Sequence, residues 1–150
     1  MKLLKRIGVL LIIVLVGIQF IPTTRNENNE VLTTEFIKAF NPPKNISYLL
    51  KTSCYDCHSN NTNYPWYNKI QPISWFLERH IKEAKEELNF SEFGEYSIRK
   101  QKSKLKSISN QIKDDEMPLS SYTLIHRDAK LSEKDKSELE KWLTELRDSL

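Results

Sequence analysis

Glycine most restricts what this chain can fold into, because only 3 of its 150 residues are glycine. Tight hairpin turns and phosphate-binding loops rely on glycine, which adopts positive φ angles without strain. The scarcity argues against a turn-rich β-sandwich and against a glycine-rich nucleotide site. Helices need no glycine, so we expect an all-α protein, and the length allows one domain.

The spacing of apolar residues agrees with this fold class, because it follows the helical period. Asn45 and Ser132 are the expected N-caps of two helices, and Asp135 completes a capping box with Ser132. The second predicted helix carries an apolar stripe formed by Ile73, Phe76, Leu77, Ile81, Ala84 and Leu88. In all, we predict helices over residues 46–52, 73–88, 95–113 and 132–150.

The first 22 residues differ sharply from the rest in charge and hydropathy. Residues 7–21 contain no charge, and the first 26 residues include basic but no acidic side chains. A basic start followed by an apolar run is typical of an export segment. Bulky residues, Gln19-Phe20-Ile21-Pro22, end the run where signal cleavage needs small ones. We therefore favour an uncleaved transmembrane signal anchor over a cleaved signal peptide.

This interpretation divides the chain into three parts. Residues 1–22 are the predicted anchor, 23–45 a polar tether, and 46–150 the functional domain. The 23 Lys and Arg residues, less the three in the anchor, balance the 20 Asp and Glu residues. An exported part without net charge lacks the basic surface that nucleic acid requires, so we expect no nucleic-acid partner.

Both cysteines lie in the sequence Cys54-Tyr55-Asp56-Cys57-His58. Cys-x-x-Cys-His is the attachment motif of c-type haem, in which two thiols bond one porphyrin and the next imidazole ligates iron. We therefore predict one covalent haem c, with Cys54 and Cys57 as attachment sites and His58 as proximal ligand. The alternatives are a small disulfide loop, a thioredoxin-like pair without its βαβ surround, and a zinc site that recruits His80 or His126.

A second axial ligand is predicted at Met117, the only methionine besides Met1. It follows three acidic residues and precedes Pro118, and such polar surroundings are not typical of a residue in the hydrophobic core. A thioether opposite an imidazole raises the reduction potential of haem iron and suits electron transfer. His80 and His126 are the fallback ligands. Four aromatic residues could pack against the haem or form hydrogen bonds to its propionates, although ordinary core packing explains them equally well. They are Trp66, Tyr67, Trp75 and Tyr122.

The chain resembles c-type cytochromes broadly, and it looks more closely like the bacterial haem-binding domain family of exported, membrane-tethered proteins. The likeness covers about residues 19–150 and rests on the following pieces: Cys54-Tyr55-Asp56-Cys57-His58-Ser59, Tyr64-Pro65-Trp66-Tyr67, Ile70, Pro72, Ser74, Trp75, Leu88-Asn89-Phe90-Ser91, Glu116-Met117-Pro118, Tyr122, His126, Leu131-Ser132 and Trp142. It implies a small cytochrome-c-like helical domain with one haem c.

We therefore expect a membrane-anchored monohaem cytochrome that transfers single electrons to an unidentified redox protein. Two filled axial positions leave no open site for a substrate, so we do not expect an enzyme. The alternative is a haem-based sensor or a peroxidase-like protein with an open sixth iron position. The expected location is the bacterial cytoplasmic membrane, with the C-terminal domain in the periplasm or otherwise outside the cytoplasm.

Overall fold

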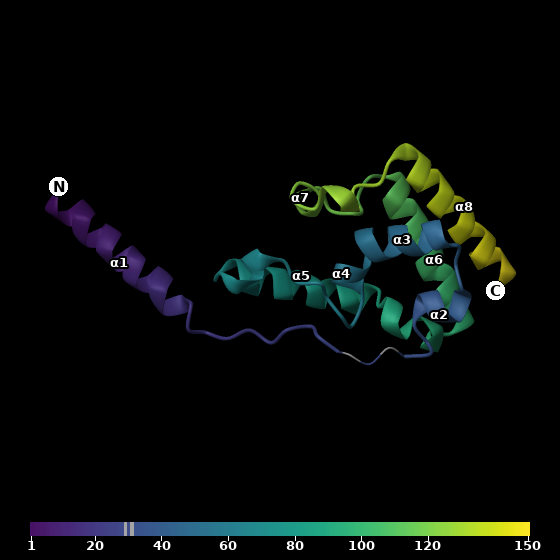
Figure 1. Ribbon diagram of the computed structural model, residues 1–150, viewed down its shortest axis with the longest axis horizontal. Coiled ribbons are helices and arrows are strands. Elements are labelled where there is room, and N and C mark those ends of the chain that lie inside the picture. Colours follow the sequence, from purple (N-terminus) through teal and green to yellow (C-terminus); the bar gives the residue numbers. More distant parts are fainter. Residues whose placement is uncertain (29, 31) are drawn as a thin grey trace.

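The computed structural model describes residues 1–28, 30 and 32–150. Helices are the regular elements of these residues, and the only β contact found among them is a single bridge between Glu27 and Asn61. The all-α fold expected from the sequence is confirmed. Figure 1 shows a helical domain at one end of an elongated molecule, with the first helix projecting at the other end.

Short helices alternate with longer ones along the chain. The elements are α1 (Lys2–Ile18), α2 (Phe36–Phe40), α3 (Lys44–Ser53), α4 (Tyr55–His58), η1 (Trp66–Lys69), α5 (Ile73–Glu87), η2 (Phe90–Glu95), α6 (Ile98–Lys113), α7 (Ser120–Thr123), η3 (Arg127–Ala129) and α8 (Glu133–Ser149). All four predicted helices form, as α3, α5, α6 and α8.

The helix caps were predicted in one case and missed in the other. Ser132 forms the expected capping box, in which its side chain accepts from the Asp135 amide and its amide donates to the Asp135 carboxylate. Asn45 is not an N-cap, because α3 begins at Lys44, two residues earlier than predicted, and Pro43 occupies the N-cap position. Its Nδ2 instead donates to Glu138 Oε2 of α8 at 2.8 Å. A tertiary contact therefore replaces the predicted cap.

The first helix is shorter than the predicted anchor. α1 has 17 residues, and none of the helices in the described ranges is long and apolar enough to cross a membrane. The transmembrane anchor over residues 1–22 is therefore not supported. The helix ends where the Gln19 side chain pairs with the backbone of Gln71: Nε2 donates to the Gln71 carbonyl and Oε1 accepts from the Gln71 amide, both at 3.0 Å.

The segment predicted as a tether is attached to the domain. The Asn26 side chain donates to the Ser59 carbonyl and the Thr62 hydroxyl, both at 2.8 Å, and accepts from Lys85 Nζ at 2.6 Å. Further along, Phe36 is fully buried in the core. Two positions of this segment, 29 and 31, lie outside the described residues. Much of the predicted tether therefore packs as part of the folded unit.

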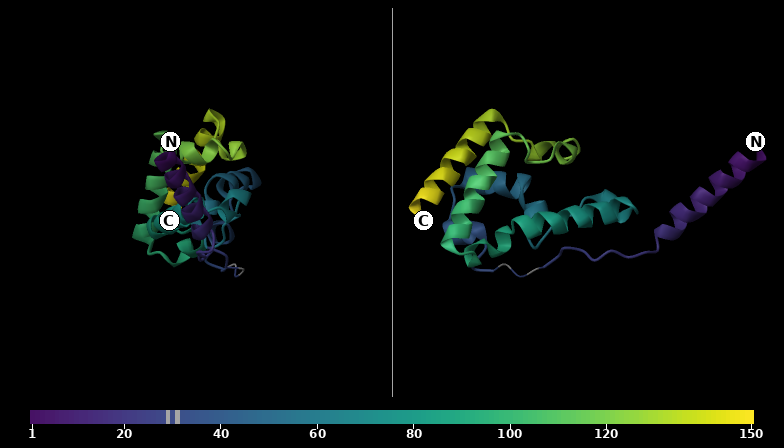
Figure 2. Two further views of the ribbon diagram at one scale, coloured as in Figure 1. Left: turned by 90° about the vertical axis from the view of Figure 1, so that its left-hand side faces the viewer. Right: turned by 180° about the vertical axis from the view of Figure 1, so that it is seen from behind.

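The hydrophobic core lies where α6 and α8 pack side by side, which Figure 2 shows in its right-hand view. Phe36 joins it through edge contacts with Phe90 and Phe93, with ring centroids 5.2 and 4.8 Å apart. The buried residues of this core are Phe36, Ile46, Leu50, Leu88, Phe90, Phe93, Leu105, Ile112, Leu131, Leu139 and Leu143.

Only part of the predicted stripe on α5 is buried. Ile81 and Leu88 are buried, but Ile73 and Phe76 at the start of the helix are exposed. The core therefore covers only the C-terminal part of the predicted stripe. Figure 1 shows the reason: α5 extends away from α6 and α8 toward α1, so its first turns lie beyond the core.

Candidate functional site

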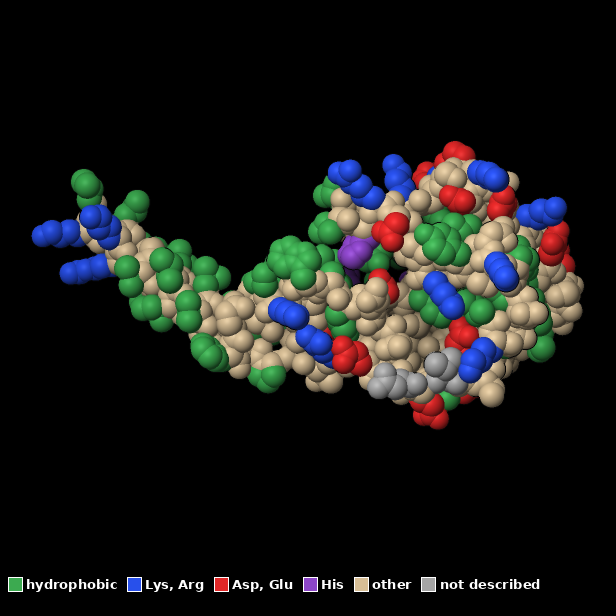
Figure 3. Space-filling view, viewed as in Figure 1, with side chains coloured by type: hydrophobic (Ala, Val, Ile, Leu, Met, Phe, Trp, Pro, Cys, Tyr) green, Lys and Arg blue, Asp and Glu red, His purple; other side chains and the backbone are tan. Residues whose placement is uncertain are grey.

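A cavity of about 490 Å³ lies between α4, α5, α6 and the segment around α7. Five of the predicted site residues line it, namely Cys54, Cys57, His58, Met117 and Tyr122. Its volume falls within the ~300–1,000 Å³ that is usual for small-molecule and cofactor sites. Figure 3 shows a hollow between the α5 and α7 regions, with a histidine side chain (purple) visible in it.

The cysteine motif is positioned by the junction of two helices. The Cys54 amide donates to the Leu50 carbonyl and ends α3, while the Cys54 carbonyl accepts from the His58 amide and opens α4. Both thiols are free. Burial, and then the neighbouring Cys57, raises the pKa of Cys54 to about 12; burial, and then Asp56, raises the pKa of Cys57 to about 11. Both sulfurs are therefore protonated at neutral pH.

The His58 imidazole is fixed by the C-terminal end of α5. Its Nδ1 lies 3.0 Å from the Ala84 carbonyl oxygen and 3.1 Å from that of Leu88. Since a carbonyl can only accept, Nδ1 carries the proton and Nε2 keeps its lone pair. Burial lowers the pKa of His58, against the two hydrogen bonds, which raise it. The ring is thus held neutral with Nε2 available for a metal, the usual arrangement of a histidine ligand.

Met117 reaches the cavity through a tight turn after α6. The amides of Glu116 and Met117 both donate to the Gln111 carbonyl, at 2.9 and 3.2 Å. Asp115 supports this reversal with a left-handed φ of 58°. The turn places Met117 in the lining of the cavity that holds His58.

Tyr122 connects α7 to the cysteine motif. Its hydroxyl donates to Asp56 Oδ2 at 2.7 Å, and its ring stacks on His126 with centroids 4.3 Å apart. Burial, together with the hydrogen bond to Asp56, raises the pKa of Tyr122, so the hydroxyl keeps its proton. Asp56 also accepts from the Asn63 amide at 3.2 Å. This carboxylate therefore ties two segments to the turn that carries both thiols.

Of the other predicted residues, only His80 is among the described residues that line this cavity. The described lining does not include Trp66, Tyr67, Trp75 or His126. Trp66 is 74% exposed, and Tyr67 is hydrogen-bonded through its hydroxyl to His126 Nε2 at 2.7 Å. These three aromatic residues therefore do not line the cavity that contains the cysteines.

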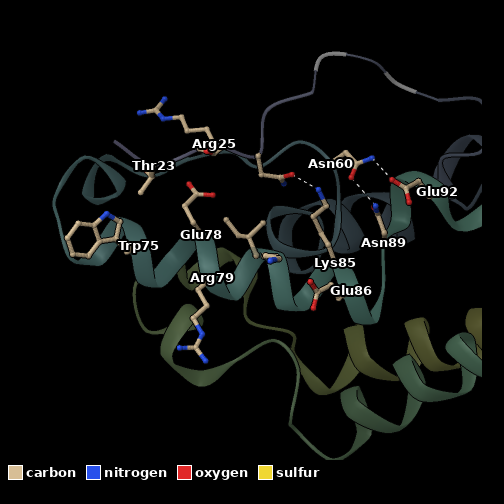
Figure 4. Close-up of a pocket in the computed structure, with 14 residues that line it drawn as sticks. Thr23, Arg25, Asn60, Trp75, Glu78, Arg79, Lys85, Glu86, Asn89 and Glu92 are labelled. Carbon is tan, nitrogen blue, oxygen red and sulfur yellow. Dashed lines mark hydrogen bonds between the residues drawn. The ribbon is translucent and has the colours of Figure 1, made fainter. Parts of the chain in front are cut away.

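Trp75 lines a second cavity, of about 730 Å³, between residues 23–26 and the opposite side of α5. Figure 4 shows that its walls are polar and carry both charge signs, with Arg25, Glu78 and Lys85 among them. Neither Cys54 nor Cys57 is among its described lining residues. The thiols and imidazole of the motif thus belong to the first cavity.

The first cavity also has a polar wall, which was not predicted from the sequence. Lys104 lies there, with its Nζ 3.5 Å from Glu87 Oε2, and so do Glu83, Ser107 and Gln111. Lys104, Ser107 and Gln111 recur at three- and four-residue intervals, so their common face on α6 could have been recognised. Periodicity alone does not reveal that such a face borders a cavity.

The lining residues fit a haem. Two half-buried cysteines three residues apart, a neutral imidazole with a free Nε2 and a methionine supply the donor set of a c-type centre. An apolar wall formed by Leu88, Phe90, Ile108, Ile112 and Leu131 suits a porphyrin face. In the described ranges, no group of three or more His, Cys, Asp or Glu side chains is arranged to hold a metal ion.

Comparison with known proteins gives an independent result. The model of one protein family, described as the haem-binding domain, matches residues 13–145. No curated protein and no solved structure matches the chain. The family match spans the cavity, the cysteine motif and most of the core, and the chain therefore belongs to the haem-binding domain family.

Proposed function

We propose that the protein is a monohaem c-type electron carrier, in which Cys54 and Cys57 hold the haem covalently and His58 ligates its iron. The observation that carries the proposal is that both free thiols and the ring with the unprotonated Nε2 line one cavity. The short motif helix and the methionine turn across the cavity support a cytochrome-c-like arrangement. When bound, the haem supplies a centre that gains and loses one electron.

The chain's own residues have three tasks in this proposal. The thiols of Cys54 and Cys57 would hold the haem, each through a thioether bond to one porphyrin vinyl group, so that the haem could not dissociate. The Ala84 and Leu88 carbonyls fix the His58 ring and increase its basicity as a ligand. Apolar side chains exclude water, which limits the reorganisation that accompanies a change of charge. None of these tasks includes a chemical step on a substrate, so we propose a carrier and not an enzyme.

Met117 is proposed as the second axial ligand. Its place in the cavity lining supports this role, and the turn held by the Gln111 carbonyl supplies the necessary support. A bound thioether blocks small ligands and raises the reduction potential. His80 also lines the cavity, but it belongs to α5, the helix that supplies the acceptors for His58. Met117 approaches from a different element, which suits the opposite side of a porphyrin.

The basic residues and apolar body of α1 support export of the domain, and haem attachment of this type is expected outside the cytoplasm. We propose a location on the outer side of the cytoplasmic membrane and a redox protein as electron partner. Fractionation tests the location: haem-stained protein confined to the cytoplasm contradicts it.

The covalent link is tested by producing the full chain with a haem-attachment system and staining a denaturing gel for haem. We expect the native chain to stain, the double variant Cys54→Ala/Cys57→Ala to remain unstained, and the control Ser53→Ala to stain as the native chain does. Absence of stain from the native chain contradicts covalent attachment.

The optical spectrum tests Met117. We expect a far-red sulfur-to-iron band that is lost in Met117→Ala while covalent haem remains, whereas His80→Gln keeps the band. Carbon monoxide should bind the ferrous Met117→Ala protein promptly and the native protein slowly. Prompt binding to the native protein favours the alternative function, a sensor or peroxidase-like protein with an open position.

A further inference from the structure

Exposed apolar side chains border the mouth of the cavity. Trp66, Phe76, Leu124 and Ile125 are 74%, 66%, 77% and 62% exposed. Large apolar residues are usually exposed singly, so a contiguous group marks an interaction surface. We define the apolar patch as Trp66, Ile70, Ile73 and Phe76 from the η1–α5 region, with Leu119, Leu124 and Ile125 from the α7 region.

The two halves of the apolar patch lie close together beside the cavity. A hydrogen bond of 2.7 Å joins Tyr67 of η1 to His126, the residue after Ile125. Trp66 contacts the Tyr67 ring edge-on, with centroids 5.9 Å apart, and Leu119 itself lines the cavity. In Figure 3 the green side chains gather over those ends of the α5 and α7 regions that lie toward α1.

The two stretches of chain that carry the apolar patch contain basic but no acidic residues. No acidic residue occurs between Asp56 and Glu78, or between Glu116 and Asp128. Within these two stretches the charged side chains are Lys69 and Arg127, both of which are exposed. Acidic and basic residues balance over residues 23–150, so the lack of carboxylates is particular to these two stretches, which end at Glu78 and Asp128. Apolar side chains flanked by Lys and Arg suit an anionic lipid surface.

The position of α1 indicates the same partner. The Gln19–Gln71 hydrogen bonds join the end of α1 to the chain between Ile70 and Ile73, at the edge of the patch. α1 has no buried residue, and its apolar side chains are exposed on all sides. A helix that is apolar all round is stable in contact with lipid or a protein core. Lipid can cover both α1 and the adjoining patch at once.

We propose that the apolar patch docks on the surface of an anionic lipid bilayer, with Trp66 at the lipid–water interface and Lys69 and Arg127 against the headgroups. Tryptophan prefers this interface, and basic side chains near it bind acidic lipids. In the docked state the mouth of the haem cavity faces the membrane surface, on the same side as α1. This docking is separate from electron transfer and does not depend on the iron ligands.

Hydroxyl-radical footprinting of the full-length, haem-containing protein tests the proposal side chain by side chain. The probe is a vesicle of phosphatidylcholine with phosphatidylglycerol. We expect oxidation of Trp66, Phe76, Leu124 and Ile125 to slow severalfold on these vesicles. Tyr48 on α3 and Ile98 at the start of α6 are exposed apolar residues outside the patch, and their oxidation should not change.

The charge requirement is tested with Lys69→Glu/Arg127→Glu. Each basic residue near an anionic surface contributes about fivefold to binding, so loss of two shifts the docking equilibrium at least about 30-fold. Protection of the patch should disappear while α1 remains on the vesicle. The matched control Lys106→Glu/Lys141→Glu reverses two exposed charges on α6 and α8 and should keep the protection.

Three results overturn the proposal. The first is equal oxidation of the patch with and without anionic vesicles. The second is equal protection on vesicles of phosphatidylcholine alone, which removes the role of Lys69 and Arg127. The third is protection without vesicles that increases with protein concentration, which identifies the patch as an interface between protein copies.

Discussion

The hydrogen bond between Tyr122 and Asp56 should hold α7 over the cavity, and Tyr122→Phe tests this. The hydroxyl donates to a carboxylate oxygen at 2.7 Å in a half-buried site. Hydrogen bonds to charged groups contribute about 1.5–3 kcal/mol, and partial exposure favours the lower end. We expect the free energy of unfolding to fall by about 1.5 kcal/mol. For a domain of about 130 residues this corresponds to a drop in Tm of about 5 °C.

Denaturant unfolding of a double-mutant cycle measures the bond itself. The cycle comprises Tyr122→Phe, Asp56→Ala and both together, so that loss of the separate Asn63–Asp56 contact cancels. We expect a coupling energy of about 1 kcal/mol or more. Tyr48→Phe, at an exposed tyrosine, is the control and should leave stability unchanged. A coupling below about 0.3 kcal/mol refutes the reasoning, because α7 would then be held by other contacts.

Three further predictions concern packing and pH. Gly94→Ala should destabilise the fold by about 1–3 kcal/mol, because a Cβ at this position would lie 2.9 Å from the Thr34 carbonyl oxygen. Phe36→Ala should cost about 3–5 kcal/mol, since this fully buried ring belongs to the segment predicted as a tether. In the haem-free chain, burial lowers the pKa of His58 in the folded state. Below pH 6.5 the unfolded state therefore binds more protons than the folded state. The free energy of unfolding should accordingly fall as the pH is lowered from 6.5 to the pKa of folded His58. Urea unfolding measures all three.

Each of these changes has a matched control. Gly17→Ala should not destabilise, because nothing lies within 4 Å of the added Cβ. Tyr48→Ala removes an exposed aromatic ring and should cost far less than Phe36→Ala. For the pH effect, His58→Gln should lose less stability than the native chain between about pH 7.5 and pH 5.5. Equal loss in both proteins would assign the effect to other titrating groups.

The donor residues of the candidate site could be proposed from the sequence, but the residues that support them could not. Cys54, Cys57 and His58 lie within five residues of one another, so the motif predicts a common role. The carbonyls that orient His58 belong to Ala84 and Leu88, and backbone atoms leave no trace in residue type. Likewise, Tyr122 was a candidate for haem contact, while its bond to Asp56 depends on how α7 returns to α4.

The features that could be predicted from the sequence alone depend on local interactions. They are the helical class, the central parts of α3, α5, α6 and α8, and the capping box of Ser132. Helical periods and caps involve residues only three or four apart, so they can be read directly. Tertiary contacts decided that Phe36 enters the core, that Ile73 and Phe76 face outward and that α1 ends at Gln19. An apolar stripe shows that a face avoids water, but only the neighbouring elements in space decide which part of it another surface covers.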